Sequence, residues 1–145
     1  MDFEIENFLM KDFEGVIALL QKSFKLGSID QNKARPMLKT LMREHNDVFL
    51  VAKAKGAVVG FIHVHFHKDP FRPELKHATL WYFAIDDKHR NKGYGLQLFD
   101  AAVEQCKHLG VNEIRATTSI TNIASQRVAE HSGFKKGISY KLKLQ

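Results

Sequence analysis

The stretch HRNKGYGLQL (residues 89–98) places two glycines and two arginine or lysine side chains directly before a segment with helical periodicity. Gly93 and Gly95 have no side chain, so a ligand can approach the backbone closely at these positions. The first N–H groups of a helix have no partner within the helix, and the helix dipole makes that end positive. Arg90 and Lys92 add positive charge, and no acidic residue follows in the first turn. The stretch therefore predicts an anion site, with phosphate or pyrophosphate as the natural occupant.

The glycine spacing differs from two common phosphate-binding loops. A Walker A loop needs four residues and then Gly-Lys-Ser/Thr after its first glycine, and this chain lacks them. A dinucleotide fingerprint needs a third glycine where the chain has Leu98. A polar turn whose glycines only permit tight geometry remains the alternative from these residues alone.

Hydrophobic periodicity predicts alternating strands and helices along the rest of the chain. Strands are expected at residues 3–8, 47–56, 57–69, 75–85, 112–120 and 136–144, and helices at residues 11–24, 30–45, 96–110 and 123–133. Gly56 predicts a hairpin turn, Asp30 an N-cap and Gly110 a helix stop. Pro36 predicts a kink in the second helix or its division in two. This order is typical of a mixed α/β domain with a partly antiparallel sheet and helices on both faces.

Two segments carry packing predictions. Residues 75–85 are almost continuously apolar, which indicates a strand buried on both faces in the middle of the sheet. In the helix at residues 96–110, the apolar face is expected to contain Leu96, Phe99, Val103 and Cys106.

Length and composition favour one globular domain over residues 1–145, with 44% apolar and 26% charged residues. The single cysteine, Cys106, excludes an intrachain disulfide and favours a reducing compartment. Acidic residues stand near the N-terminus where a signal peptide carries lysine or arginine. The apolar run at residues 78–85 is too short to span a bilayer. We therefore expect a cytoplasmic protein without a membrane partner.

The net charge of +6, with eight histidines in addition, favours an anionic ligand or partner. Charge alone does not choose between phosphate, nucleic acid and an acidic protein. The absence of a nucleic-acid motif and of aromatics interleaved on a basic face argues against nucleic acid.

Residues 83–110 (FAIDDKHRNKGYGLQLFDAAVEQCKHLG) and residues 122–134 (NIASQRVAEHSGF) resemble the GCN5-related N-acetyltransferase (GNAT) superfamily. Arg90, Gly93 and Gly95 match its Arg/Gln-x-x-Gly-x-Gly/Ala signature, and Asn122 to Phe134 match its Asn-led helix ending in Gly-Phe. The resemblance implies the acyl-CoA N-acyltransferase fold, an α+β fold with a mixed, mostly antiparallel sheet of six to seven strands. It also implies acetyl-CoA as the donor, with its pyrophosphate on the backbone amides of the glycine turn.

The resemblance further implies that the backbone of Phe83, Ala84 and Ile85 pairs with the pantetheine arm. The N–H near Ile85 would polarise the acetyl carbonyl, as an oxyanion requires. Asn122 would contact the pantetheine or its strand, although it also suits a helix N-cap. The implied cofactor residues are Phe83, Ala84, Ile85, Arg90, Asn91, Lys92, Gly93, Tyr94, Gly95, Leu96, Asn122 and Ser125.

The chain departs from the family at two catalytic positions. Many members have a tyrosine where this chain has Ala129, and a Glu or His where it has Thr79. Ser125, Tyr140 or water are candidates for the missing acid. His77, or one of the alternating histidines His63, His65 and His67, is a candidate base, directly or through water.

These histidines have two other interpretations. A metal site is disfavoured, because residues at i and i+4 of a strand lie about 13 Å apart, so we expect no metal. A polar, solvent-facing side of the strand is the other. Cys106 is a candidate acyl-carrying nucleophile or, on the apolar stripe of its helix, a core residue.

Three functions fit the sequence. The first is direct acetyl transfer from acetyl-CoA to a primary amine on a small molecule, an amino sugar or a protein N-terminus. The second is a catalytically weak acetyl-CoA-binding regulator, which the missing acid and base would permit. The third, a basic nucleic-acid or ribosome-associated module, rests on charge only. A homodimer through the last strands is common in such domains and is compatible with the resemblance.

Overall fold

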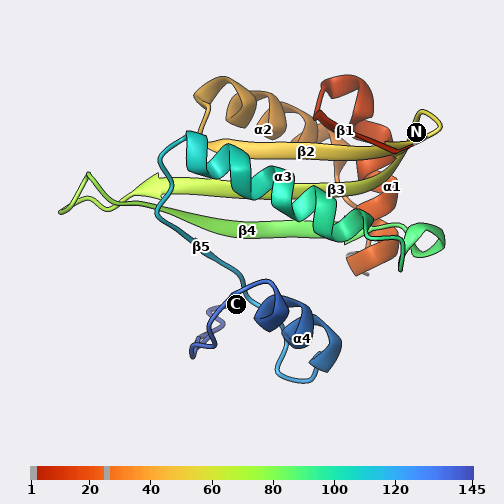
Figure 1. The fold of residues 1–145 in the computed structure, drawn as a ribbon. Coiled ribbons are helices and arrows are strands. Elements are labelled where there is room, and N and C mark those ends of the chain that lie inside the picture. Colours follow the sequence, from red (N-terminus) through yellow and green to blue (C-terminus); the bar gives the residue numbers. More distant parts are fainter. Residues whose placement is uncertain (1–2, 25–26) are drawn as a thin grey trace. The chain divides into compact units, whose positions relative to one another are not determined.

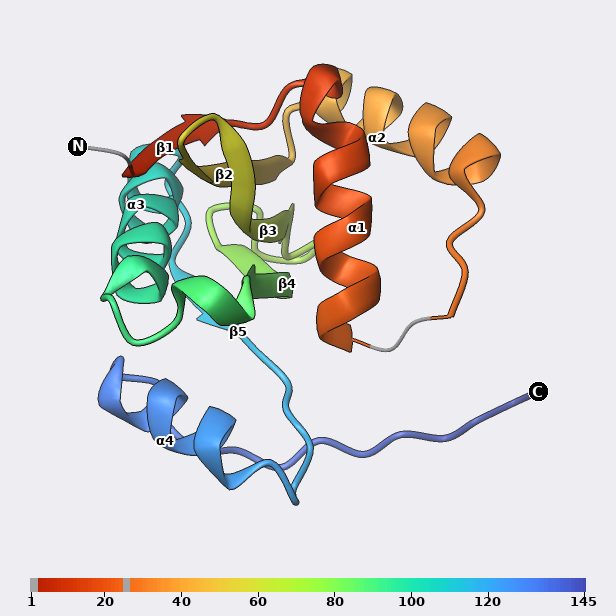
Figure 2. The ribbon, with the colours of Figure 1, turned by 90° about the vertical axis from the view of Figure 1, so that its right-hand side faces the viewer.

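A computed structural model describes residues 3–24 and 27–145 of the chain. They fall into two compact units, which divide between Arg115 and Ala116 and are described separately. In the first unit, helices cover both faces of one sheet (Figures 1 and 2). Its elements are β1 (Phe3–Asn7), η1 (Met10–Asp12), α1 (Phe13–Phe24), α2 (Gln31–Glu44), β2 (Asp47–Ala54), β3 (Ala57–Lys68), β4 (Lys76–Ile85), η2 (Asp87–His89), α3 (Tyr94–His108) and β5 (Glu113–Arg115). The second unit contains α4 (Ile123–His131).

The strands follow one another in the sheet in the order β1-β2-β3-β4-β5. Neighbours are antiparallel except β4 and β5, which are parallel and joined by α3. This arrangement confirms the predicted fold class, a mixed and mostly antiparallel sheet with helices on both faces. Two-residue loops with positive φ at both positions suit hairpins, and Lys55 (φ 51°) and Gly56 (φ 80°) form the predicted turn between β2 and β3.

The number of strands differs from the prediction. Within the described residues the sheet has five strands rather than six or seven. The strand expected at residues 112–120 is reduced to β5, and residues 136–144 form no strand. Alternation becomes a strand only where a neighbouring strand supplies the ladder hydrogen bonds. The apolar side chains of that last segment are exposed instead, at Ile138, Tyr140, Leu142 and Leu144.

The core lies in two layers, one on each side of the sheet. In β2, Val48 and Leu50 belong to the layer that contains α3, whereas Phe49 and Val51 belong to the layer that contains α1. Figure 2 shows α3 on one side of the strands and α1 with α2 on the other. β2 and β3 are therefore the strands buried on both faces.

β4 is less buried than its sequence predicts. Of its residues only Ala78 and Ala84 are fully buried, and Trp81 is 58% exposed. The physical reason is its place in the sheet, because short β5 covers only the first part of its outer edge.

α3 begins at Tyr94, two residues before the predicted start, with Gly93 as N-cap. It buries Leu98, Ala102 and Cys106, which are spaced four residues apart and pack against the sheet. The expectation that Leu96 belongs to the buried face is wrong, since Leu96 is 56% exposed. The three buried residues follow the i, i+4, i+8 spacing that places side chains on one face of a helix.

α2 is one continuous helix that contains Pro36. Its N-cap is Asp30, as predicted, because Asp30 Oδ1 accepts a hydrogen bond from the Asn32 N–H at 3.0 Å. Across residues 3–24 and 27–145, none of the helices combines the length and the apolar character needed to cross a membrane.

Replacing Gly60 with alanine should destabilise the first unit. A Cβ there would lie 2.7 Å from Ile85 Cδ1 and 3.0 Å from Ala52 Cβ, and overpacking of this kind costs about 1–3 kcal/mol. The midpoint of urea unfolding should fall accordingly. Gly95→Ala is the matched control, since its Cβ would meet Ile85 Cγ1 at an ordinary 3.6 Å. Equal midpoints for the two variants would contradict the close packing of β3 against Ile85 and Leu98.

Cys106 should resist alkylation in the folded protein. It is 2% exposed, and burial raises the pKa of its thiol to about 11. At pH 8 the thiolate, the form that reacts with iodoacetamide, is then on the order of a thousandth of the total. We expect no labelling under native conditions and complete labelling in guanidinium. Rapid labelling of the native protein would instead support the acyl-carrying nucleophile.

Candidate active site

The glycine turn connects the end of β4 to α3. Asn91 (φ 62°) and Gly93 (φ 78°) both adopt left-handed backbone conformations. Gly93, the N-cap, has no side chain to accept from the first N–H groups of α3, and the first turn contains no acidic residue. A Cβ built on Gly93 would meet no heavy atom within 4 Å. The start of α3 is thus uncapped and faces open space, which suits the anion predicted from the sequence.

Two side chains of the turn have structural contacts. The Tyr94 ring stacks on Phe3 with centroids 3.9 Å apart, so a ligand at the turn would meet the Tyr94 backbone rather than its ring. The Arg90 guanidinium donates to the Ile85 carbonyl at 3.3 Å and pairs with Asp87 at 2.9 Å. Arg90 therefore ties the turn to the end of β4, while Lys92 is exposed beside it.

An acidic residue, Asp86, links the same turn to α1 through hydrogen bonds. Asp86 accepts hydrogen bonds from Lys22 Nζ at 3.1 Å and His89 Nδ1 at 3.2 Å. Burial would raise the pKa of Asp86, but these two partners outweigh it and the pKa is lowered. The Asp86 carboxylate is thus compensated by Lys22 and by hydrogen-bond donors of the turn.

β4 has an open outer edge next to this turn. β5 pairs only with His77, Ala78 and Thr79. From Leu80 to Ile85 the described chain offers no strand partner on that side. An unpaired strand edge presents backbone N–H and C=O groups that an extended ligand can pair with. The predicted pantetheine residues Phe83, Ala84 and Ile85 lie on this edge.

β4 also contains a bulge that sequence alternation did not reveal. Tyr82 pairs with His63 and Leu80 pairs with Val64, so Trp81 has no partner on β3. The extra residue changes which side chains share a face. Leu80 and Phe83 consequently both pack in the α3 layer, although they are three residues apart.

The predicted histidines lie together on the opposite face, the one that α1 covers. The His63 ring stacks on Phe49, which belongs to the α1 layer, at 4.2 Å. The His65 and His67 rings are 6.4 Å apart, and the His67 and His77 rings are 6.3 Å apart. Among the described residues no group of three or more His, Cys, Asp or Glu could hold a metal ion.

Asp47, at the start of β2, is a site residue that sequence reasoning missed. Its Oδ2 lies 2.6 Å from His63 Nε2 and 3.0 Å from His65 Nδ1. The Asp47 side chain is 1% exposed, and its Oδ1 is buried without a hydrogen-bond partner in the described structure. Counting back from the Gly56 turn would place Asp47 opposite Val64, and only the register shift between Ala52 and Lys53 moves it opposite His65. No local sequence signal marks that shift.

His63 and His77 have distinct electrostatic surroundings. Burial lowers the pKa of His63 more than the neighbouring Asp47 raises it, so the ring is neutral near pH 7. His77 Nδ1 lies 3.4 Å from the guanidinium of Arg115, which also pairs with Glu113.

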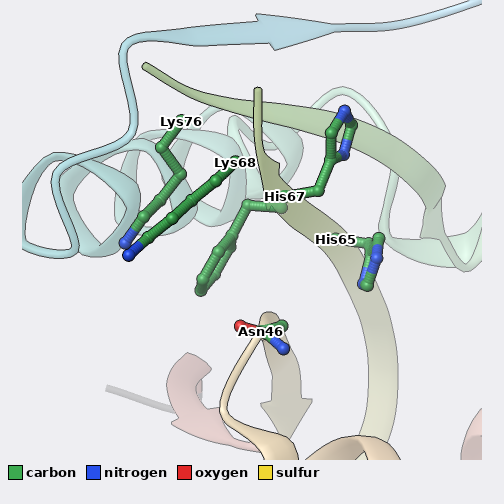
Figure 3. A pocket seen from close by; sticks show the side chains of 6 residues that line it. Asn46, His65, His67, Lys68 and Lys76 are labelled. Atoms are coloured by element: carbon green, nitrogen blue, oxygen red, sulfur yellow. The ribbon is translucent and has the colours of Figure 1, made fainter. Parts of the chain in front are cut away.

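A shallow hollow opens at the end of β3 and the start of β4. It has a volume of about 350 Å³ and is lined by Asn46, His65, Phe66, His67, Lys68 and Lys76. Lys68 and Lys76 pair across the strands, and Figure 3 shows their side chains extending in the same direction. The His65 side chain, which is 35% exposed, thus borders solvent at this hollow.

The second unit contains the remaining predicted residues. Asn122 caps α4, because its Oδ1 accepts from the Ser125 N–H at 3.0 Å. Gly133 (φ 95°) follows the end of α4, and the Phe134 N–H donates to the Ala129 carbonyl at 3.0 Å. Ser125 is exposed and Tyr140 is 92% exposed. Asn122 therefore has the capping role that was one of its two interpretations.

Comparison with known proteins identifies the family. Residues 8–134 match the model of the acetyltransferase (GNAT) family. N-acetyltransferase family 8 member 7 of Mus musculus is 26% identical over 98 residues, which are 68% of this chain and 43% of that protein. The chain thus spans less than half the length of this relative.

Solved structures agree on the fold. Glucosamine-6-phosphate N-acetyltransferase from Arabidopsis thaliana superposes with a TM-score of 0.83 at 18% identity and 100% coverage of both chains. AAC(6′)-Iy, in complex with the bisubstrate analogue CoA-S-monomethyl-acetylneamine, gives 0.81 at 20% identity and 99% coverage of both. The match over residues 8–134 establishes that the chain belongs to the acetyltransferase (GNAT) family.

Proposed function

We propose that the chain is an acetyl-CoA-dependent N-acetyltransferase that moves the acetyl group directly to a primary amine. The observation that carries the proposal is the uncapped, cationic start of α3 beside the open edge of β4. The start of α3 suits the phosphates of a nucleotide, and the open edge of β4 suits an extended arm that contains amides. Acetyl-CoA has both parts in one molecule.

The donor site would use backbone more than side chains. The amides after Gly93 would hold the pyrophosphate, with Arg90, Asn91 and Lys92 around it, and Gly95 and Leu96 in the first turn of α3. Residues Phe83 to Ile85 would pair with the pantetheine. Family membership supports this assignment, and so does the CoA-containing analogue bound to the similar AAC(6′)-Iy.

The reactive end of acetyl-CoA would then approach the bulge. An arm that runs from the turn along β4 passes Ile85 first and covers about 13 Å by the time it reaches Trp81. An outward N–H of this segment would polarise the acetyl carbonyl and stabilise the oxyanion. The bulge is where His63 and Tyr82 are paired, so this end of the arm lies near the histidine face.

The acceptor is proposed as a primary amine on a small molecule, an amino sugar or a protein N-terminus. Similar structures include glucosamine-6-phosphate and aminoglycoside acetyltransferases. His65 or His77 would accept the amine proton, and Ser125 or Tyr140 would supply one to the departing sulfur. We propose that residues 1–145 act as one catalytic domain, as the sequence predicts.

A second function, an acetyl-CoA-binding regulator without strong activity, has a specific observation in its favour. Ala129 and Thr79 replace side chains with which many family members handle protons. Both functions require acetyl-CoA binding, and only the first requires transfer. A cytoplasmic location and a homodimer remain expectations from the sequence, the former resting on the free, buried Cys106.

Acetyl-CoA should raise the melting temperature of the protein, since a ligand that binds only the folded state stabilises it. A screen of amines, amino sugars and N-terminal peptides should then yield a product heavier by one acetyl group, with release of free thiol. Stabilisation without transfer to any acceptor would favour the regulator. No stabilisation at millimolar acetyl-CoA would contradict both functions.

A charge placed in the first turn of α3 should separate helix stability from donor binding. Leu96→Glu puts an acid at the positive end of the helix, where it is neutral or stabilising for the free protein. It should nevertheless weaken acetyl-CoA binding by at least about 1 kcal/mol, roughly five-fold in Kd, through repulsion of the pyrophosphate.

Leu96→Gln is the control, because glutamine has nearly the same shape as glutamate but no charge. Its Kd, measured by titration calorimetry, should stay within about two-fold of the wild type. Equal Kd values for the Glu and Gln variants would contradict a pyrophosphate at this turn.

A further inference from the structure

We propose that Asp47 is a positioning residue that orients His65 as the general base of the transfer reaction. The inference rests on the proposed function and deepens it, since it selects one base among the candidate histidines. It starts from the shared carboxylate oxygen between β2 and β3. Asp47 Oδ2 lies 2.6 Å from His63 Nε2 and 3.0 Å from His65 Nδ1.

The hydrogen bonds fix the tautomers of both rings. An ionised carboxylate only accepts hydrogen bonds, so each histidine must donate an N–H to Asp47. His63 then carries its proton on Nε2, and His65 carries its proton on Nδ1. The neutral His65 ring is left with a free lone pair on Nε2, the atom required to accept a proton.

His77, the other candidate, has the opposite arrangement. Its Nδ1 lies 3.4 Å from Arg115 Nη2, and a guanidinium only donates. His77 Nδ1 must therefore accept, and a neutral ring carries its proton on Nε2. No lone pair of His77 remains for the acceptor amine, so the geometry favours His65.

The burial of Asp47 gives its carboxylate an electrostatic role in addition to orienting the His65 ring. Its side chain is 1% exposed, and its Oδ1 has no hydrogen-bond partner among the described residues. A buried carboxylate with neutral donors only is poorly compensated. A proton that arrives on His65 supplies the missing positive charge, much as the aspartate of a Ser-His-Asp triad stabilises its imidazolium.

The surrounding groups direct that proton to His65 rather than His63. The His63 side chain is only 12% exposed, whereas that of His65 is 35% exposed and lines the hollow in Figure 3. The other titratable neighbour is His67, whose ring is 6.4 Å from that of His65. The lysines of the hollow, Lys68 and Lys76, extend away from His65 in Figure 3. On β4 the residue paired with His65 is Thr79, which does not titrate.

The proposed step is balanced as follows. His65 Nε2 takes one proton from the ammonium group of the acceptor and later returns it to water. The free amine attacks the acetyl carbon, and the C–N bond forms while the carbonyl electrons move to oxygen. When this intermediate collapses, the C–S bond breaks, and the second amine proton goes to the departing sulfur.

A double-mutant cycle tests the coupling between the two residues. In the full chain, Asp47→Asn and His65→Ala should each lower kcat by about 10²-fold or more, the usual contribution of general base catalysis. The double variant should be no slower than His65→Ala, because Asp47 acts through His65. The KM for acetyl-CoA should stay unchanged, and Asp100→Asn, an exposed change on α3, should keep wild-type kcat.

The pH profile adds a readout that a purely structural role would not move. Asn cannot stabilise the imidazolium, so the acidic limb of the Asp47→Asn profile should move to lower pH. An unchanged profile, or an Asp47→Asn effect as large in the His65→Ala background as in the wild type, would overturn the proposal.

Histidine ¹⁵N NMR of the wild type tests the orientation without any acceptor and without a variant that must fold. At pH 8 we expect His65 protonated on Nδ1 and His77 protonated on Nε2. Protonation of His65 on Nε2 would overturn the proposal. If no amine is acetylated but these tautomers are found, the proposed function fails while the orientation of His65 stands.

Discussion

β4 is held by β3 along its length but by β5 over only three residues, and the candidate site depends on this imbalance. Asn112 fixes where β5 begins, because its Oδ1 accepts from the Lys76 N–H at 2.9 Å and its own N–H donates to the Lys76 carbonyl at 2.8 Å. After Arg115 the chain leaves the ladder. The second half of β4 keeps its hydrogen bonds to β3, while the backbone groups on its other edge have no strand partner in the described chain. This unpaired edge lies directly before the uncapped start of α3.

The bulge at Trp81 connects this edge to the histidine face. Phe83 and Ile85 pack in the α3 layer, while His77 and Thr79 of the same strand lie on the α1 side with His65 and His67. A donor on the open edge and a base on the α1 face can thus approach the same point of β4. The buried carboxylate of Asp47 lies on β2, which is separated from β4 by β3.

Much of the framework could be predicted from the sequence, because it depends on local rules. The Lys55-Gly56 turn needs positive φ at both residues, and glycine reveals it. Asp30 marks the start of α2 as its N-cap, and Gly110, with φ 78°, marks the end of α3. The family resemblance rests on the same glycine turn.

The rest depends on non-local pairing, which residue patterns do not record. An extra residue such as Trp81 leaves the apolar run of β4 unchanged, yet it reverses the faces beyond it. Asp47 looks like an ordinary polar strand start until the register places it beside two histidines. Residues 136–144 alternate as a strand does, but alternation cannot supply a partner. The prediction for Leu96 is wrong because α3 has more apolar residues than its buried face contains, and the sequence does not show which of them face the sheet.

Amide hydrogen exchange along β4 tests most directly the central claim that acetyl-CoA binds as an added strand on the open edge. Saturating acetyl-CoA should slow exchange in residues 80–85 and in the first turn of α3, while the amides that join β1 to β2 keep their rates. Unchanged exchange in residues 80–85 with acetyl-CoA demonstrably bound would contradict the account.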